Sequence, residues 1–139
     1  MLAVVDPNVL VSALISTGGP PRQIVSAWVE GRFELLVSPV LLTELGDVLA
    51  RPKFRRWVSA AAAADFVEGL QGAALVIQDP PAQPGHSPDP DDDYLIALAR
   101  AGEADYVVSG DRHLTGIADP KPPVLTPRQF LELIETRSP

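Results

Sequence analysis

The sequence predicts a single α/β domain in which a short, mostly parallel β-sheet is flanked by α-helices. Short apolar runs, typical of strands buried on both faces, alternate with amphipathic segments of helical periodicity. This alternation is typical of parallel sheets, whose strands need crossover connections. The chain has 139 residues, a length typical of one domain, and its 46% hydrophobic residues are ordinary for a globular protein. We expect the domain to span residues 1–135, with 136–139 as a C-terminal tail.

The expected strands and helices follow one another in a regular order. Apolar runs predict strands at residues 1–6, 33–38, 73–78, 105–111 and 123–126. Helical periodicity predicts helices at residues 7–16, 22–31, 39–51, 59–72, 92–102 and 126–135. Pro7 and Pro127 suit first helical turns, Thr126 suits an N-cap, and Gly31 suits the end of a helix. The five prolines of residues 79–91 indicate one long connection across the sheet rather than a domain boundary.

Composition and charge exclude several classes of protein. The chain has no cysteine, which excludes disulfides, zinc–thiolate sites and cysteine nucleophiles. No apolar run reaches transmembrane length, and Asp6 and Pro7 interrupt the first one, so we expect a cytoplasmic protein without a secretory signal. The net charge of −7 argues against nucleic-acid binding through bulk positive charge. The charge is nevertheless segregated, with a basic segment at 51–57 and an acidic one at 89–93.

Two aspartates stand at the ends of apolar strands. Asp6 ends the first strand, and Asp111 follows the apolar run of the fourth. In open α/β sheets, sites form at the carboxyl ends of strands, near the point where the strand order reverses. A functional role is the favoured interpretation of Asp6, whereas ordinary turn chemistry explains Asp111 equally well.

Four aspartates crowd residues 89–93, directly before an apolar helix. One or two carboxylates can cap a helix and meet its dipole, but four exceed that need. Asp92 lies on the same helical face as the apolar residues within 95–99 and should point inward. Asp93, one position later, is expected at the side of that face. Asp89 and Asp91 are interpreted as caps or outer residues, and simple capping remains an alternative for all four.

Glu44 is a further candidate, because it lies at the margin of the apolar face of residues 39–51. A surface glutamate is the alternative. If Asp6, Glu44, Asp92 and Asp111 converge, like charges about 4 Å apart cost on the order of 4 kcal/mol per pair at an effective dielectric near 20. Such a cluster must take up protons or divalent cations. All-oxygen ligation suits one or two Mg²⁺ or Mn²⁺ ions, which would activate water for displacement at phosphorus.

Four segments, in this order, resemble motifs of the PIN-domain family: VVDPNVLVSAL, SPVLLTELGDVLARPKF, DPDDDYLIALA and ADYVVSGD. The resemblance covers about residues 1–135 and is closest to toxin components of toxin–antitoxin pairs (VapC-like). It implies a PIN-like fold with its acidic site at the strand C-terminal ends and a Mg²⁺- or Mn²⁺-dependent endoribonuclease activity. It further implies a homodimer and a cognate antitoxin.

The resemblance also implies roles for individual residues. The residues matching the catalytic and metal-binding acidic quartet are Asp6, Glu44, Asp92 and Asp111. The residues matching supporting polar positions are Asn8 and Ser109, and Asp93 is a further supporting candidate beside the quartet. Three departures stand out: Pro7 replaces a usual threonine, Ser109 replaces a commoner threonine, and the DDD run leaves Asp92 or Asp93 open as the ligand. We favour Asp92.

The basic segment 51–57 is a candidate RNA-backbone contact with aromatic stacking nearby. Its cations are Arg51, Lys53, Arg55 and Arg56. A solvated helix end with two buried aromatic residues is the alternative. Both histidines, His86 and His113, are expected to face solvent, although His113 could touch a substrate phosphate.

Two other functions are also compatible with the sequence. Aspartate-based phosphatases and receiver domains also gather carboxylates at strand ends, but the former need an aspartate where this chain has Asn8. Both also need a supporting lysine, and neither Lys53 nor Lys121 follows a clear strand. A catalytically inactive RNA- or protein-binding module is the second alternative, against which the intact acidic quartet argues.

Overall fold

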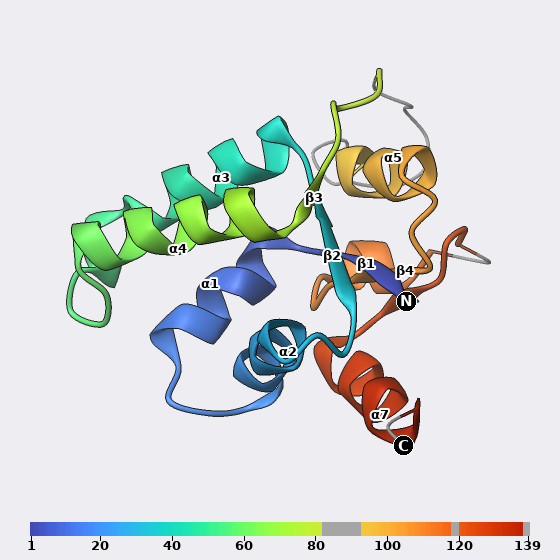
Figure 1. Ribbon diagram of the computed structural model, residues 1–139, viewed down its shortest axis with the longest axis horizontal. Coiled ribbons are helices and arrows are strands. Elements are labelled where there is room, and N and C mark those ends of the chain that lie inside the picture. The colour runs from blue at the N-terminus through green and yellow to red at the C-terminus, as the bar shows by residue number, and fades with distance from the viewer. Residues whose placement is uncertain (82–92, 118–119, 138–139) are drawn as a thin grey trace.

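The computed structural model describes residues 1–81, 93–117 and 120–137, with only the backbone of Asp93 included. Within these ranges, five strands form one sheet in the order β3-β2-β1-β4-β5, and every neighbouring pair is parallel (Figure 1). The predicted parallel α/β class is therefore confirmed. The strands are β1 (Leu2–Val5), β2 (Glu34–Val37), β3 (Leu75–Val76), β4 (Tyr106–Val108) and β5 (Val124–Leu125).

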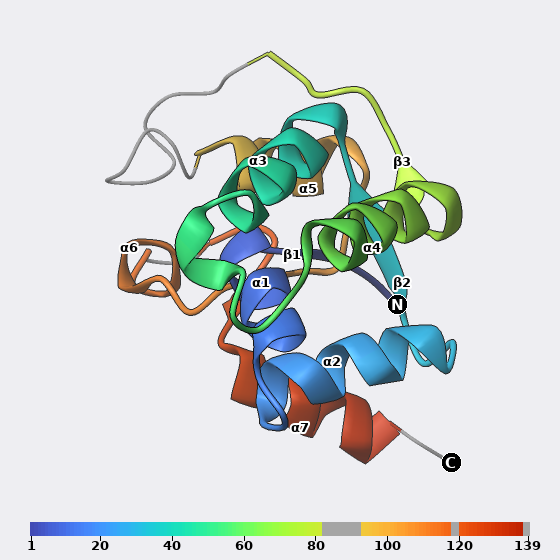
Figure 2. The same cartoon turned by 90° about the vertical axis from the view of Figure 1, so that its left-hand side faces the viewer.

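Helices connect the strands and cover both faces of the sheet. Helices α1, α3 and α4 lie in front of the sheet in Figure 2, and α5 lies behind it. No helix of the described ranges is long and apolar enough to cross a bilayer. The helical segments are α1 (Pro7–Ile15), α2 (Pro20–Val29), α3 (Pro39–Leu49), the 3₁₀ turn η1 (Pro52–Phe54), α4 (Ala60–Ala73), α5 (Asp93–Ala101), α6 (Arg112–Thr115) and α7 (Pro127–Arg137).

Proline and short polar residues set the helix ends, as the sequence predicts. Helices α1, α2, α3 and α7 each begin at a proline, whose fixed φ suits the first turn. Thr126 caps α7, because its Oγ1 accepts a hydrogen bond from the Gln129 backbone N–H at 3.1 Å. Gly31 directly follows the C-cap of α2 and adopts a φ of 78°, a left-handed conformation that glycine tolerates.

Several helix boundaries differ from the expectation by one or two residues, and one helix is additional. Helix α2 begins at Pro20 rather than residue 22, because the two prolines fit its first turn. Helix α7 continues to Arg137, two residues past the expected end. The short helix α6 was not expected, and it forms because Asp111 caps it, with Oδ1 accepting from the His113 backbone N–H at 2.8 Å. Most of the long connection predicted at 79–91 lies outside the described residues.

The register of the sheet brings three strand ends together. Val5 of β1 pairs with Val108 of β4, so the residues that follow, Asp6 and Ser109, are neighbours. The backbone N–H of Asp6 continues the ladder by donating to the Val108 carbonyl at 2.9 Å. On the other side, Ala3 pairs with Leu35 of β2, which aligns the end of β2 with the end of β1. The carboxyl ends of β2, β1 and β4 therefore form one edge, at the point where the strand order reverses.

Candidate active site

Asp6 lies at the centre of this edge. It ends the central strand β1 and caps α1, so the chain turns directly from strand to helix at this residue. Its side chain is only 4% exposed, whereas buried aspartates are rare unless they are paired. Oδ1 accepts from the Asn8 backbone N–H at 2.9 Å, and Oδ2 accepts from the Ser109 hydroxyl at 2.8 Å. Asn8 therefore supports Asp6 through its backbone, while its own side chain is exposed.

Ser109 links the two strand-end aspartates. It is fully buried at the end of β4, where its hydroxyl donates to Asp6. The same oxygen accepts from the Asp111 backbone N–H at 3.0 Å. Asp111 is half-buried, and its carboxylate caps α6 as described above. By its sequence alone, Asp111 fits turn chemistry and a functional role equally well; in the structure it lies beside Asp6 and also caps α6.

Burial and a neighbouring charge both raise the pKa of Asp6. Removal from water raises the pKa of the Asp6 carboxyl, and the nearby charge of Asp111 adds to the rise. The hydrogen bonds from Asn8 and Ser109 oppose it without cancelling it. An ionised Asp6 is therefore costly in the protein alone, and a cation beside it would remove that cost.

Glu44 faces the same edge from α3. Its side chain is half-buried, and its Oε2 accepts a hydrogen bond from the hydroxyl of Tyr94 on α5. Burial and the carboxylate of Glu44 raise the pKa of the Tyr94 hydroxyl, with smaller contributions from Asp6 and Asp79. The carboxylates of three different segments thus act on one phenol, which shows that they share a neighbourhood.

Asp79 is a residue that the sequence analysis missed. It follows the third strand after Gln78, and its Oδ2 accepts from the Val40 backbone N–H at 2.9 Å, at the start of α3. Its Oδ1 is buried and has no hydrogen-bond partner among the described residues. The signal was available, because Asp79 follows the apolar run of the third expected strand after a single glutamine.

Part of the predicted site lies outside the described residues. These are Asp89, Asp91, Asp92 and His86, while Asp93 is described only as the first residue of α5. Among the residues that are described, no group of three or more acidic or histidine side chains is close enough to hold a metal. The available donors are all carboxylate and hydroxyl oxygens, and Asp6 is a buried carboxylate among them. This chemistry fits a hard ion such as Mg²⁺ or Mn²⁺.

The basic segment divides into structural and exposed cations. Arg55 donates to the backbone carbonyls of Leu49 and Val58, so it holds the end of α3. Lys53 lies 5.1 Å from the ring centroid of Phe54, and Arg56 lies 5.0 Å from that of Trp57. The alternative of two buried aromatics holds for Phe54 only, because Trp57 is 54% exposed. The segment lies at the end of α3 and α4 remote from α5 (Figure 1).

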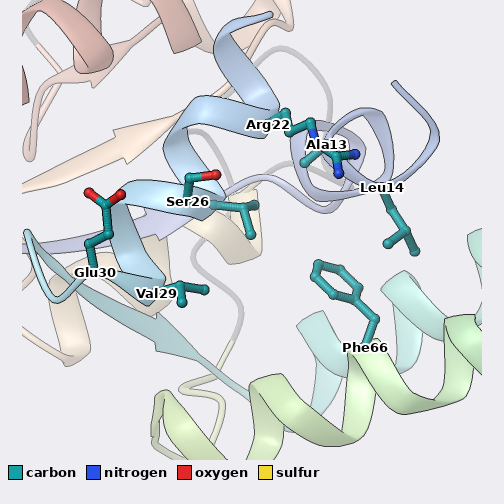
Figure 3. Close-up of a pocket in the computed structure, with 8 residues that line it drawn as sticks. Ala13, Leu14, Arg22, Ser26, Val29, Glu30 and Phe66 are labelled. Carbon is teal, nitrogen blue, oxygen red and sulfur yellow. The ribbon is translucent and has the colours of Figure 1, made fainter. Parts of the chain in front are cut away.

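Two hollows differ in their relation to the acidic residues. A surface groove along α3 contains both Glu44 and Arg51, so it joins the acidic edge to the first cation of the basic segment. A separate, mainly apolar hollow lies between α1, α2 and α4, where Leu14, Val29 and Phe66 point toward one another (Figure 3). None of the candidate site residues lines this second hollow.

We expect Ser109→Ala to lower the free energy of unfolding by about 1–3 kcal/mol. The substitution removes the hydroxyl donor to Asp6 and the acceptor of the Asp111 N–H at a fully buried position. Urea unfolding of the metal-free protein measures the loss. Ser26→Ala, the same change at an exposed position of α2, is the control and should leave stability within about 0.5 kcal/mol. An equal effect of the two substitutions would contradict the bridging role of Ser109.

Comparison with known proteins identifies the family. The sequence matches the family described as PIN domain over residues 3–113. It is 28% identical over 141 residues to the uncharacterized protein MJ1680 of Methanocaldococcus jannaschii, covering 95% of this chain and 90% of that protein. The matched region contains every described residue of the acidic edge.

Solved structures show the same fold. PAE2754 from Pyrobaculum aerophilum superposes with a TM-score of 0.65 and 17% identity, covering 98% of this chain and 90% of that one. VapBC2 from Rickettsia felis, bound to a DNA fragment from their promoter, gives a TM-score of 0.61 at 12% identity, covering 91% and 98%. FitAcB from Neisseria gonorrhoeae gives a TM-score of 0.51 at 17% identity, and the match covers 91% of this chain and 98% of that one. The family match spans most of the chain and confirms the resemblance of the four motifs, so the protein belongs to the PIN-domain family.

Proposed function

We propose that this protein is a Mg²⁺- or Mn²⁺-dependent endoribonuclease and the toxin of a toxin–antitoxin pair. The single observation that carries the proposal is Asp6, a buried carboxylate at the end of the central strand that is held in place by Ser109 and lies beside Asp111. Membership of the PIN family, whose members are generally nucleases, supports the hydrolase class. The neighbours VapBC2 and FitAcB support the toxin role.

Each residue of the acidic edge has a role in this proposal. Asp6, Glu44 and Asp111, together with Asp92, would hold one or two ions. When bound, such an ion lowers the pKa of water and neutralises charge at the reacting phosphate. Ser109 fixes the orientation of the Asp6 carboxylate, and the backbone N–H of Asn8 fixes its other oxygen.

The groove along α3 supports a path for the RNA strand. It leads from Glu44 to Arg51, so a phosphate held by Arg51 would place the neighbouring backbone toward the acidic edge. Lys53 and Arg56 extend the positive charge beyond the groove, and the exposed Trp57 offers a surface for base stacking. Arg55 is assigned to stabilising the segment instead.

The proposal includes partners and location. A small cognate antitoxin would block the acidic edge, and two copies of the chain would form a homodimer in the cytoplasm. The rival phosphatase or receiver mechanism gains no support, because the amino group of Lys53 lies over the Phe54 ring and Asn8 has an exposed side chain.

The test is cleavage of a mixed RNA pool by purified protein with Mg²⁺, Mn²⁺ or EDTA. We expect cutting with either metal, none with EDTA, and a loss of about a hundredfold in Glu44→Gln. Glu68→Gln, an exposed glutamate on the neighbouring helix α4, should cut at the wild-type rate and controls for contaminating nucleases. Folded protein that binds Mn²⁺ without cutting RNA would contradict the proposal and favour an inactive binding module.

A further inference from the structure

We infer that Tyr94 is a positioning residue, whose hydroxyl fixes the Glu44 carboxylate in the orientation in which it binds the divalent cation. The inference rests on the proposed metal-dependent function and assigns a new residue to it. Tyr94 belongs to neither the acidic quartet nor the supporting residues. It is the second residue of α5, next to Asp93 and two positions after Asp92.

The hydrogen bond joins two elements on opposite faces of the sheet. Tyr94 donates from the start of α5, and Glu44 accepts in the middle of α3. The helices otherwise reach the edge independently, because α3 follows β2 and α5 leads into β4. The phenol therefore ties the glutamate of α3 to the first turn of α5.

The chemistry of the contact suits this role. A hydroxyl that donates to a carboxylate forms a charge-assisted bond, which is stronger than a neutral one and fixes the acceptor. The bond uses Oε2, so the other oxygen of Glu44 can coordinate a cation. Half-burial of the ring holds the phenol in place. Hydrogen bonds of this kind to metal ligands are worth about 10–100-fold in metal affinity.

Tyr94→Phe tests the inference, because it removes the hydroxyl and keeps the ring. We expect the Mn²⁺ dissociation constant, measured by titration calorimetry, to rise about tenfold or more. The Mn²⁺ concentration that half-activates RNA cleavage should rise in parallel, while KM for RNA at saturating Mn²⁺ stays unchanged. Tyr106→Phe is the matched control and should leave the Mn²⁺ dissociation constant unchanged. Tyr106 is the other tyrosine of the chain, and its ring centroid lies 6.2 Å from that of Phe130.

A double-mutant cycle separates positioning from packing. If Tyr94 acts through Glu44, then Tyr94→Phe in a Glu44→Gln background leaves the Mn²⁺ dissociation constant where Glu44→Gln alone puts it. Wild-type protein that binds Mn²⁺ and cuts RNA, with an unchanged dissociation constant in Tyr94→Phe, overturns the inference alone. A loss that persists at full size in the Glu44→Gln background also overturns it. Wild-type protein that binds no Mn²⁺ overturns the proposed function and this inference together.

Discussion

Replacing Asp6 by asparagine is expected to abolish RNA cleavage and to stabilise the metal-free protein at neutral pH. Activity should fall by at least about a hundredfold, or about 2.7 kcal/mol in the activation barrier, because the central carboxylate of the site is lost. Stability should rise because the neutral amide avoids the cost of burying an ionised group. The amide oxygen can still accept from Asn8, and its NH₂ group can donate to the Ser109 hydroxyl oxygen.

The stability difference should depend on pH with a definite sign. Because the folded protein raises the pKa of Asp6 above its ordinary 3.8, the contribution of Asp6 to stability is fully present below that value. It is lost as the pH rises through the higher folded pKa. The advantage of Asp6→Asn over wild type should therefore be absent in acid, grow with rising pH, and level off above the folded pKa.

Urea unfolding in EDTA across this pH range, beside RNA cleavage in Mn²⁺, measures both effects. Asp65→Asn is the control, because Asp65 is exposed on α4 and its replacement should leave RNA cleavage at the wild-type rate. Addition of Mn²⁺ should make the wild type more stable than Asp6→Asn, since only the wild type has the Asp6 carboxylate to bind the ion. An Asp6→Asn variant that cuts RNA normally would remove Asp6 from the site.

Asp92→Asn is expected to lower cleavage at least about a hundredfold, whereas Asp93→Asn should change it less than about tenfold. The motif match and the helical face favour Asp92 as the ligand. The structure weakens the argument from the helical face, because residues 95–99 of α5 are all buried, at 0–2% exposed. A helix covered on most sides gives no single inward face from which to choose between two adjacent aspartates.

Parallel assays of the two variants decide the register. Mn²⁺ affinity should fall with cleavage in Asp92→Asn and stay near wild type in Asp93→Asn. Equal thermal stability of the two variants shows that helix capping is not the cause of the difference. The reverse result, with cleavage lost only in Asp93→Asn, would move the ligand by one residue.

Local rules made much of the fold predictable. Short apolar runs predicted the strands and their parallel pairing, and proline positions predicted where α1 and α7 begin. Asp6 was recognisable as a functional candidate because a carboxylate rarely ends a strand that is apolar throughout. Helix α6 was not predicted, because its only signal is an aspartate in a sequence that suits a simple turn equally well.

The sequence by itself determined the fold class, the family and the aspartate on the central strand, because these depend on periodicity and on motifs that are continuous in the chain. Only the tertiary structure decided which distant groups meet. Ser109 lies 103 residues from Asp6, and Tyr94 lies 50 from Glu44, yet each pair is hydrogen-bonded. The strand register and the approach of α5 to α3 create these contacts, and no local pattern specifies either, because both follow from how the strands order themselves around β1.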